Sequence, residues 1–162
     1  VGVTIKSTLT GNQALNLPAG SVGLGELNSN ALMTFSRVSR SAGDVSTSST
    51  TFVPFTGASV TVTLNKAGPA LTGMMGGCYN DAGTNRNDFS IFVDGVNQGG
   101  TTGDVQATDD AGSSTHNCSF TYMTPSLTQG THEIALYWSV NSGTGTMRCS
   151  TSANCTFWTL TQ

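Results

Sequence analysis

Two neighbouring residues, His132 and Glu133, are the first candidates for chemistry, because an imidazole and a carboxylate can together move a proton. They stand at the head of the run HEIALYWSV, in which apolar side chains recur at every second position. Successive side chains of a strand point to opposite faces, so the two groups cannot act on one substrate atom. The run therefore predicts a scaffold strand, with His132 in an ordinary contact at its edge.

The rest of the sequence offers no catalytic arrangement. Its histidines are His116 and His132, and its glutamates are Glu26 and Glu133, far apart along the chain. The nucleophile elbow, the zinc-protease helix and the phosphate-binding loop each have a motif that does not occur. We predict that the protein is not an enzyme; a hydrolase without a recognisable motif is the alternative.

Four cysteines form an even set that is compatible with two disulfides in an oxidising compartment. Cys149 and Cys155 flank the loop-forming stretch STSAN, so we predict that they bond to each other. Cys78 and Cys118 would then remain as a long-range pair. The closely spaced cysteine pairs of zinc sites are missing, which argues against zinc, and buried free thiols are the other alternative.

Two stretches rich in side-chain oxygens raise the question of calcium, which takes six to eight oxygen ligands. They are NDAGTNRND, residues 80–88, and DVQATDD, residues 104–110. Asparagine and aspartate are also the ordinary residues of turns, and the spacing of an EF-hand loop is absent. We predict no metal and no cofactor, with calcium as the alternative.

Two asparagines, Asn117 and Asn154, begin the acceptor pattern for N-glycosylation, in Asn-Cys-Ser and Asn-Cys-Thr. A sequence this rich in asparagine, serine and threonine produces such matches by chance. They are candidate sites if the protein is secreted by an organism that glycosylates.

Charged residues make up 9% of the chain, against about 25% in average globular domains, and the formal net charge is −3. No basic cluster is present to neutralise phosphates, which argues against nucleic acid as a partner. The apolar runs are too short to cross a bilayer, so we predict no membrane insertion. Such a composition is typical of secreted fibres, adhesins and virion proteins, and we predict an extracellular, cell-surface or virion location.

Most apolar segments alternate with period two, which indicates strands. The best helical candidate, residues 24–33, is short and polar. Two stretches, residues 39–50 and 99–117, read as surface loops. Short strands separated by glycine, serine and asparagine turns predict an all-β, antiparallel β-sandwich of eight or more strands. The strand candidates are residues 3–9, 32–38, 51–55, 60–64, 70–76, 89–95, 119–123, 132–140 and 155–161.

The two sheets of such a sandwich must enclose a common core. We predict that its core residues are Val60, Val62, Leu64, Phe92, Ile134, Leu136, Trp138, Val140 and Phe157.

Several phrases of the sequence resemble a jelly-roll domain of phage and prokaryotic surface proteins, similar to the globular heads of complement and tumour-necrosis-factor proteins. They are FVDGVNQGG (residues 92–100), TPSLTQGTH (124–132), IALYWSVNSGTGTM (134–147) and FWTLTQ (157–162). The resemblance implies a jelly roll, oligomers that are commonly trimers, and display on a fibre, capsid or cell surface. It implies no catalytic residues.

The resemblance divides the chain into an N-terminal strand and linker, residues 1–31, and a jelly-roll domain, residues 32–162. Residues 18–32 loosely resemble the stalk segments that precede such heads. Ahead of them, VGVTIKSTL places Val1, Val3 and Ile5 on one side of an alternating strand. We predict an assembly strand, which either pairs within its own sheet or adds to the sheet edge of a neighbouring subunit.

These observations favour a non-enzymatic structural subunit. It would bind copies of itself, building an extracellular filament or part of a virion surface. The alternative is a receptor- or glycan-binding head of a phage fibre or adhesin. Its contacts with a host surface would come from residues 99–117 and from exposed tyrosine or tryptophan side chains.

Overall fold

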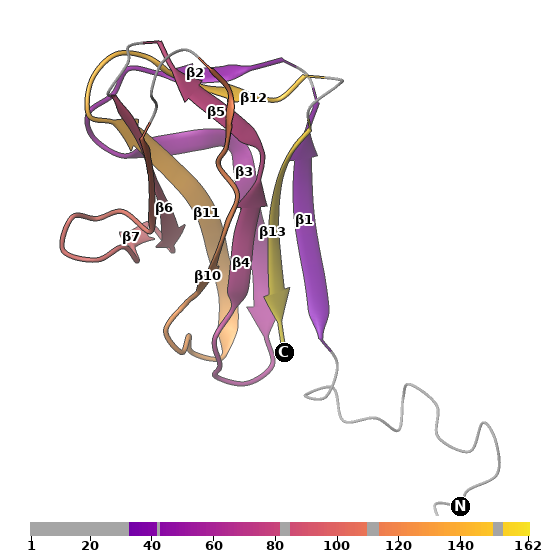
Figure 1. The fold of residues 1–162 in the computed structure, drawn as a ribbon. Coiled ribbons are helices and arrows are strands. Elements are labelled where there is room, and N and C mark those ends of the chain that lie inside the picture. The colour runs from indigo at the N-terminus through magenta and orange to yellow at the C-terminus, as the bar shows by residue number, and fades with distance from the viewer. Residues whose placement is uncertain (1–32, 42, 82–84, 110–113, 151–153) are drawn as a thin grey trace, which may run out of the picture.

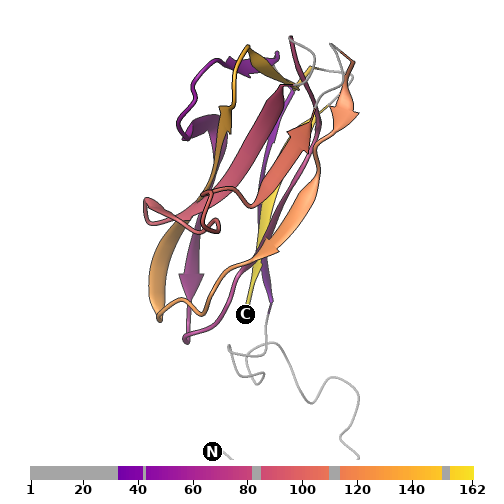
Figure 2. The same cartoon turned by 60° about the vertical axis from the view of Figure 1, so that its left-hand side comes forward.

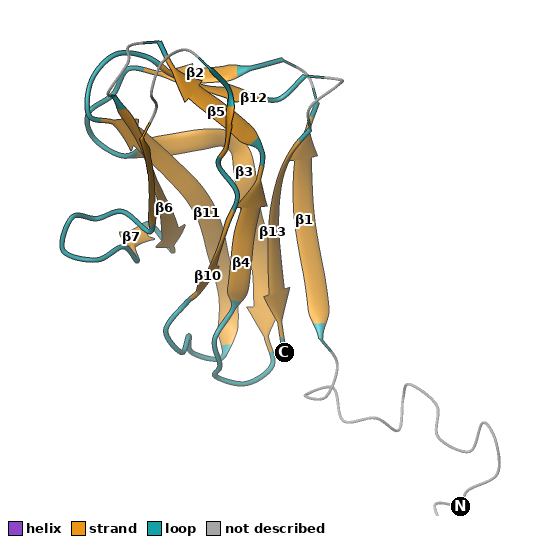
Figure 3. Cartoon of the chain, viewed as in Figure 1, coloured by secondary structure: helices purple, strands orange, loops and turns teal. Residues whose placement is uncertain are grey.

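The computed structural model describes residues 33–41, 43–81, 85–109, 114–150 and 154–162. Within these residues the fold is all-β, with strands and loops and no helix (Figure 3). The predicted assembly strand, most of the helical candidate and the predicted domain boundary lie outside them. The strands are β1 (Thr34–Arg40), β2 (Val45–Thr47), β3 (Val53–Leu64), β4 (Leu71–Met75), β5 (Gly77–Asn80), β6 (Arg86–Val93), β7 (Val96–Asn97), β8 (Gln106–Asp109), β9 (His116–Asn117), β10 (Phe120–Met123), β11 (Gly130–Val140), β12 (Gly145–Arg148) and β13 (Cys155–Thr161).

The first layer of the fold is a four-stranded antiparallel sheet in the order β1-β13-β4-β10. A second set has the order β2-β12-β5-β9. Each of its strands directly precedes or follows, in sequence, the strand at the same position in the first set. The pairing of Met75 with Thr156 is followed by that of Gly77 with Arg148, so the same neighbours stay paired across the break. The two sets are thus one layer with a bend, visible where β2, β5 and β12 turn away from the long strands (Figure 1).

The second layer has the order β3-β11-β6-β7, and β8 also pairs with β6. Counting each bent strand once, and β7 with β8 as one, the described residues form eight strands. The first layer then has the order 1-8-3-6 and the second the order 2-7-4-5, which is the double-sheet arrangement of a jelly roll. Figure 2 shows both layers from a second direction. The predicted antiparallel sandwich is confirmed.

The core lies between the layers, as strand alternation requires. In β11, His132, Ile134, Leu136 and Trp138 are buried, and Glu133 between them is exposed, so the two candidate catalytic groups do face opposite ways. The other predicted core residues in β3, β11 and β13 are also buried.

Phe92 is the exception among the predicted core residues. Its side chain is half-buried on the outer surface of the second layer, where its ring stacks on Tyr137 with centroids 3.8 Å apart. The reason is register, because Phe89, Ile91 and Val93 of the same strand point inward and are buried. The prediction of Phe92 as a core residue was therefore wrong by one position.

Three other boundaries differ from the sequence prediction. The predicted strands 51–55 and 60–64 merge into the single strand β3, which begins at Val53 and contains Gly57 at φ 81° near an irregularity in its pairing with β11. The predicted loop 39–50 contains β2, and the predicted loop 99–117 contains β8 and β9. These strands are short and polar, so they have no apolar alternation for a sequence pattern to detect.

Candidate interaction surface

His132 is held as a charged group by two acceptors. Its Nδ1 lies 2.7 Å from Oδ2 of Asp94, and its Nε2 lies 2.9 Å from the carbonyl oxygen of Thr128. Both partners are oxygens that accept hydrogen bonds, and both ring nitrogens donate only in the imidazolium form. The hydrogen bond that His132 donates to Asp94, followed by the one it donates to the Thr128 carbonyl, raises the pKa of His132 above its usual value.

The partner of His132 is a turn residue that sequence reasoning missed. Asp94 adopts φ 50° in the Asp-Gly turn after β6, and its Oδ1 accepts the backbone N–H of Glu133 at 2.9 Å. The hydrogen bonds from His132 and from this N–H lower the pKa of Asp94. The Asp-Gly pair was the available signal, since it marks a turn at the end of β6. Asp94 therefore ties the end of β6 to β11, and His132 ties β11 to the loop before it, which are structural roles.

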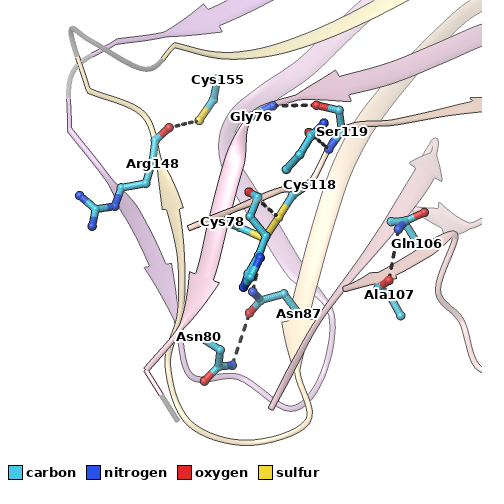
Figure 4. The surroundings of a disulfide bond; sticks show 12 residues. Gly76, Cys78, Asn80, Asn87, Gln106, Ala107, Cys118, Ser119, Arg148 and Cys155 are labelled. Atoms are coloured by element: carbon cyan, nitrogen blue, oxygen red, sulfur yellow. Dashed lines mark hydrogen bonds between the residues drawn. A yellow bond between two sulfur atoms is a disulfide. The ribbon is translucent and has the colours of Figure 1, made fainter. Parts of the chain in front are cut away.

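The structure joins Cys78 to Cys118 and Cys149 to Cys155, the same pairs that the spacing predicted. All four side chains are buried in the core cluster. The Cys78 bridge links β5 to the segment between β9 and β10, and the side-chain amide of Asn87 donates to its sulfur at 3.5 Å (Figure 4).

Both disulfides lie at the bend of the first layer. Cys149 follows β12 and Cys155 begins β13, and their Cα atoms are 5.0 Å apart although six residues separate them in sequence. This bridge closes the excursion between β12 and β13, so the two strands act as one. Gly76 lies between β4 and β5 at the same level, and a Cβ there would come within 2.8 Å of Met147. The bend is thus closely packed and covalently tied.

In the described residues, the first oxygen-rich stretch makes local contacts and most of the second forms strand β8. Oδ1 of Asp81 accepts the backbone N–H of Thr144 at 2.7 Å, and Asp88 pairs with Arg86 at 2.5 Å. The described residues contain no group of three or more histidine, cysteine, aspartate or glutamate side chains that could hold a metal. The geometry gives no support to the calcium alternative.

The candidate glycosylation sites are both on the surface. Asn117 and Asn154 are exposed, and the Oδ1 of Asn117 accepts the backbone N–H of Ser119 at 2.9 Å. In each acceptor pattern the middle residue is a disulfide-bonded cysteine, Cys118 or Cys155. Glycosylation of these sites stays a prediction.

The most unusual surface is the outward side of the first layer. The register places Phe35 beside Leu160, Leu160 beside Leu71, and Leu71 beside Met123, which makes one apolar row across all four strands. A second row brings Trp158 next to Gly73, and Met75 follows on β4. We call this surface the outer apolar face, and its residues are Phe35, Leu71, Met75, Met123, Trp158 and Leu160.

The opposite side of the same strands buries threonines beside the apolar core residues Met74 and Phe157. Thr72, Thr159 and Thr161 point into the sandwich and are at most 3% exposed. Oγ1 of Thr159 donates to Oγ1 of Thr72 at 3.1 Å, and Oγ1 of Thr72 donates to the Trp158 carbonyl oxygen at 2.8 Å. A sheet with one solvated side is normally apolar inside and polar outside. This part of the first layer is therefore patterned as a sheet with both sides covered.

The tryptophan of the outer apolar face is positioned by a glycine. A Cβ at Gly73 would lie 2.7 Å from the Trp158 ring, so only glycine lets the indole lie across β4. The Phe35 ring is 6.3 Å from that of Trp158, and the two line a shallow groove with Arg37, Met75 and Thr156. The groove is open and mostly apolar, which fits contact with another polypeptide segment better than acid–base chemistry.

No family model matches the sequence, and no curated protein matches it. Two solved structures with a similar fold are of infectious bursal disease virus. A chain from the Gx strain superposes with a TM-score of 0.53 at 11% identity, covering 82% of this chain and 33% of that one. For the Gt strain the TM-score is 0.51 at 12% identity, covering 91% of this chain and 41% of that one.

These likenesses establish the fold alone. At identities of 11–12%, no functional residue can be transferred from those chains to this one. The chain spans between a third and about two fifths of the length of those viral chains. They support a jelly roll of a kind present in a virus, and the nearer resemblance to complement and tumour-necrosis-factor heads stays a prediction. Among the described residues, no helix has the length and hydropathy to cross a bilayer.

Proposed function

We propose that this chain is a non-enzymatic structural subunit of a virion surface that assembles with copies of itself. The observation that carries the proposal is the fold likeness to infectious bursal disease virus chains, which extends over 82–91% of this chain. The disulfides support an oxidising, extracellular setting. The groove on the first layer lacks the paired titratable groups that a hydrolase would need.

Assembly through the predicted N-terminal strand is compatible with the edges of the sandwich. Among the described residues, β1 pairs only with β13 and β3 pairs only with β11, so each has one side without a ladder partner. Few charges are available to protect such edges from pairing, and natural proteins otherwise cover them. A strand from a neighbouring copy would cover one and join two subunits.

The test is a pair of matched variants in the full chain, compared by size-exclusion chromatography and electron microscopy. V3S/I5S removes apolar side chains from one side of the predicted strand, and T4S/T8S changes the other side conservatively. We expect V3S/I5S to abolish assembly and leave a folded subunit, and T4S/T8S to assemble as the wild type does. Unchanged assembly of V3S/I5S would refute the donated strand. If wild-type protein forms open filaments and not closed particles, the subunit belongs to an extracellular filament and not to a virion surface.

A further inference from the structure

The outer apolar face is a contiguous apolar surface with a definite size. Its main row crosses three inter-strand gaps of about 4.8 Å, or roughly 14 Å, and involves every strand of the sheet. Phe35, Met75 and Met123 are 58–60% exposed. The largest apolar patch on a monomer is commonly about 300–600 Å² and is often a contact site. Strands with apolar side chains on both sides, as here, are typical of sheets that are covered on both sides.

The chain enters the sandwich at the margin of this face. Met33 immediately precedes β1, is 65% exposed, and lines a second groove together with Leu71, Met123 and Leu160. Whatever precedes Met33 is therefore tethered beside the apolar row. A short tether gives a segment an effective concentration on the order of millimolar, far above that of a second copy in dilute solution.

The residues before Met33 have the chemistry that this face would bind. In the segment 18–32, Val22, Leu24, Leu27 and Leu32 are apolar and Glu26 is the single charged residue. Its charge is opposite to that of Arg37, which is exposed in the groove beside Trp158. The segment also contains Asn-Ser-Asn at 28–30, residues that favour a chain reversal. Fifteen residues can extend to about 50 Å, more than enough to cross the row.

The body of a second subunit fits this face less well. Four strands at about 4.8 Å, each about five residues long, give a projected area of roughly 300 Å². A stable interface between two folded proteins buries about 800 Å² on each partner. A narrow segment of polypeptide matches the available area, and a flat sheet-to-sheet contact would leave most of a standard interface unmade.

We propose that residues 18–32 pack on the outer apolar face of their own chain. The segment then anchors the N-terminal region to the sandwich and leaves residues 1–9 projecting for a neighbouring copy. This anchor goes beyond the structural role proposed above and does not depend on it, because it rests on the outer apolar face and the segment before Met33 alone.

Acrylamide quenching of tryptophan fluorescence in the full chain tests the anchor. Trp138 is 1% exposed and shielded, so quenching reports on Trp158. We expect L24S/L27S to raise the quenching constant roughly twofold, because the ring loses its packed cover. The matched control L15S/L17S alters leucines outside the segment and should leave quenching unchanged. The wild-type value should be the same across about a hundredfold range of protein concentration, since the contact is within one chain.

A reciprocal test changes the face and reads out the segment. Met123→Ser should speed hydrogen exchange of the amides in residues 22–27, and Val96→Ser, an equally exposed apolar residue of the other layer, should not. Equal quenching in wild type and L24S/L27S, or equal exchange in wild type and M123S, would overturn the proposal. Protection that disappears on dilution would also overturn it, by showing that a second copy covers the face. Neither readout depends on assembly, so the anchor can fail while the structural role stands.

Discussion

The two tryptophans of the chain lie in contrasting places, one in the core between the layers and one on the outer surface of the first layer. Trp138 of β11 is 1% exposed and packs between Phe55 and Phe89, with ring centroids 5.3 and 6.2 Å away. Trp158 of β13 lies on the outer apolar face over a glycine. Both strands direct apolar side chains to the core, Trp138 in β11 and Phe157 in β13, but β13 also carries apolar side chains on its outer side. Alternation of apolar residues therefore predicts a strand, but the residue types alone do not tell which side of the strand faces the core.

The sharpest test of this comparison is to truncate each ring. Trp138→Ala should destabilise the fold by about 3–5 kcal/mol, because it leaves a large cavity among packed aromatic rings. Trp158→Ala should cost only about 1–2 kcal/mol, because its ring is half-buried to begin with. Urea denaturation measures both. If W138A does not fold, Trp138→Phe still allows the ranking, and equal losses at the two sites would contradict the assignment of inner and outer sides.

The two disulfides can be compared with each other, because all four cysteines lie in the core at the bend of the first layer. In the chain-entropy model the 40-residue separation of Cys78 and Cys118 corresponds to about 4 kcal/mol. The six-residue separation of Cys149 and Cys155 corresponds to about 2 kcal/mol. We therefore expect C78A/C118A to lose roughly twice the stability that C149A/C155A loses, as measured by urea denaturation.

The pairing of the cysteines is checked separately from their energy. A non-reduced proteolytic digest analysed by mass spectrometry should contain the peptides bridged by Cys78–Cys118 and by Cys149–Cys155. A Cys78–Cys149 or Cys118–Cys155 link would contradict the structure of the bend, in which Cys78 bonds to Cys118 and Cys149 to Cys155.

How far the sequence alone could go follows from these same residues. Apolar alternation in β3, β11 and β13 predicted the sandwich and most of its core, because burial of every second side chain is what a half-covered strand requires. Phe92 failed because both neighbouring residues in β6, Ile91 and Val93, are apolar, so the pattern does not define the inward side. The strand is buried along most of its length, and a continuous apolar run does not show which alternate residues face the core.

The candidate surface could not be predicted, for a related reason. The outer apolar face combines residues of β1, β4, β10 and β13, which come together only through the jelly-roll strand order. In sequence, Leu160 between two threonines reads like any core residue of a strand. Only the pairing of Leu160 with Phe35 and Leu71, and the burial of Thr159, reveals that its side chain points outward.

The smallest expected effect on stability comes from His132. Its side chain is a charged group on the otherwise uncharged inner side of β11 and is only 11% exposed. Its raised pKa means that its contribution to stability is fully present below its unfolded value of about 6.5 and is lost as pH rises through the folded pKa. The lowered pKa of Asp94 means that its contribution is present above its unfolded value of about 3.8 and is lost as pH falls through the folded pKa. The pair therefore stabilises most between about pH 4 and 6.5.

The size of this effect is modest because the Asp94 side chain is 50% exposed and solvent screens the pair. We expect less than about 1 kcal/mol, measured as the change in free energy of unfolding between pH 6 and pH 9. Asp94→Asn should reduce that pH dependence, because the amide no longer favours the imidazolium and only the Thr128 carbonyl still does, and His116→Gln should leave it in place. A wild-type protein that becomes more stable from pH 6 to pH 9 would contradict the charged state of His132. It would instead identify the ring as a neutral donor to Asp94 and place it among the ordinary polar contacts of the strand.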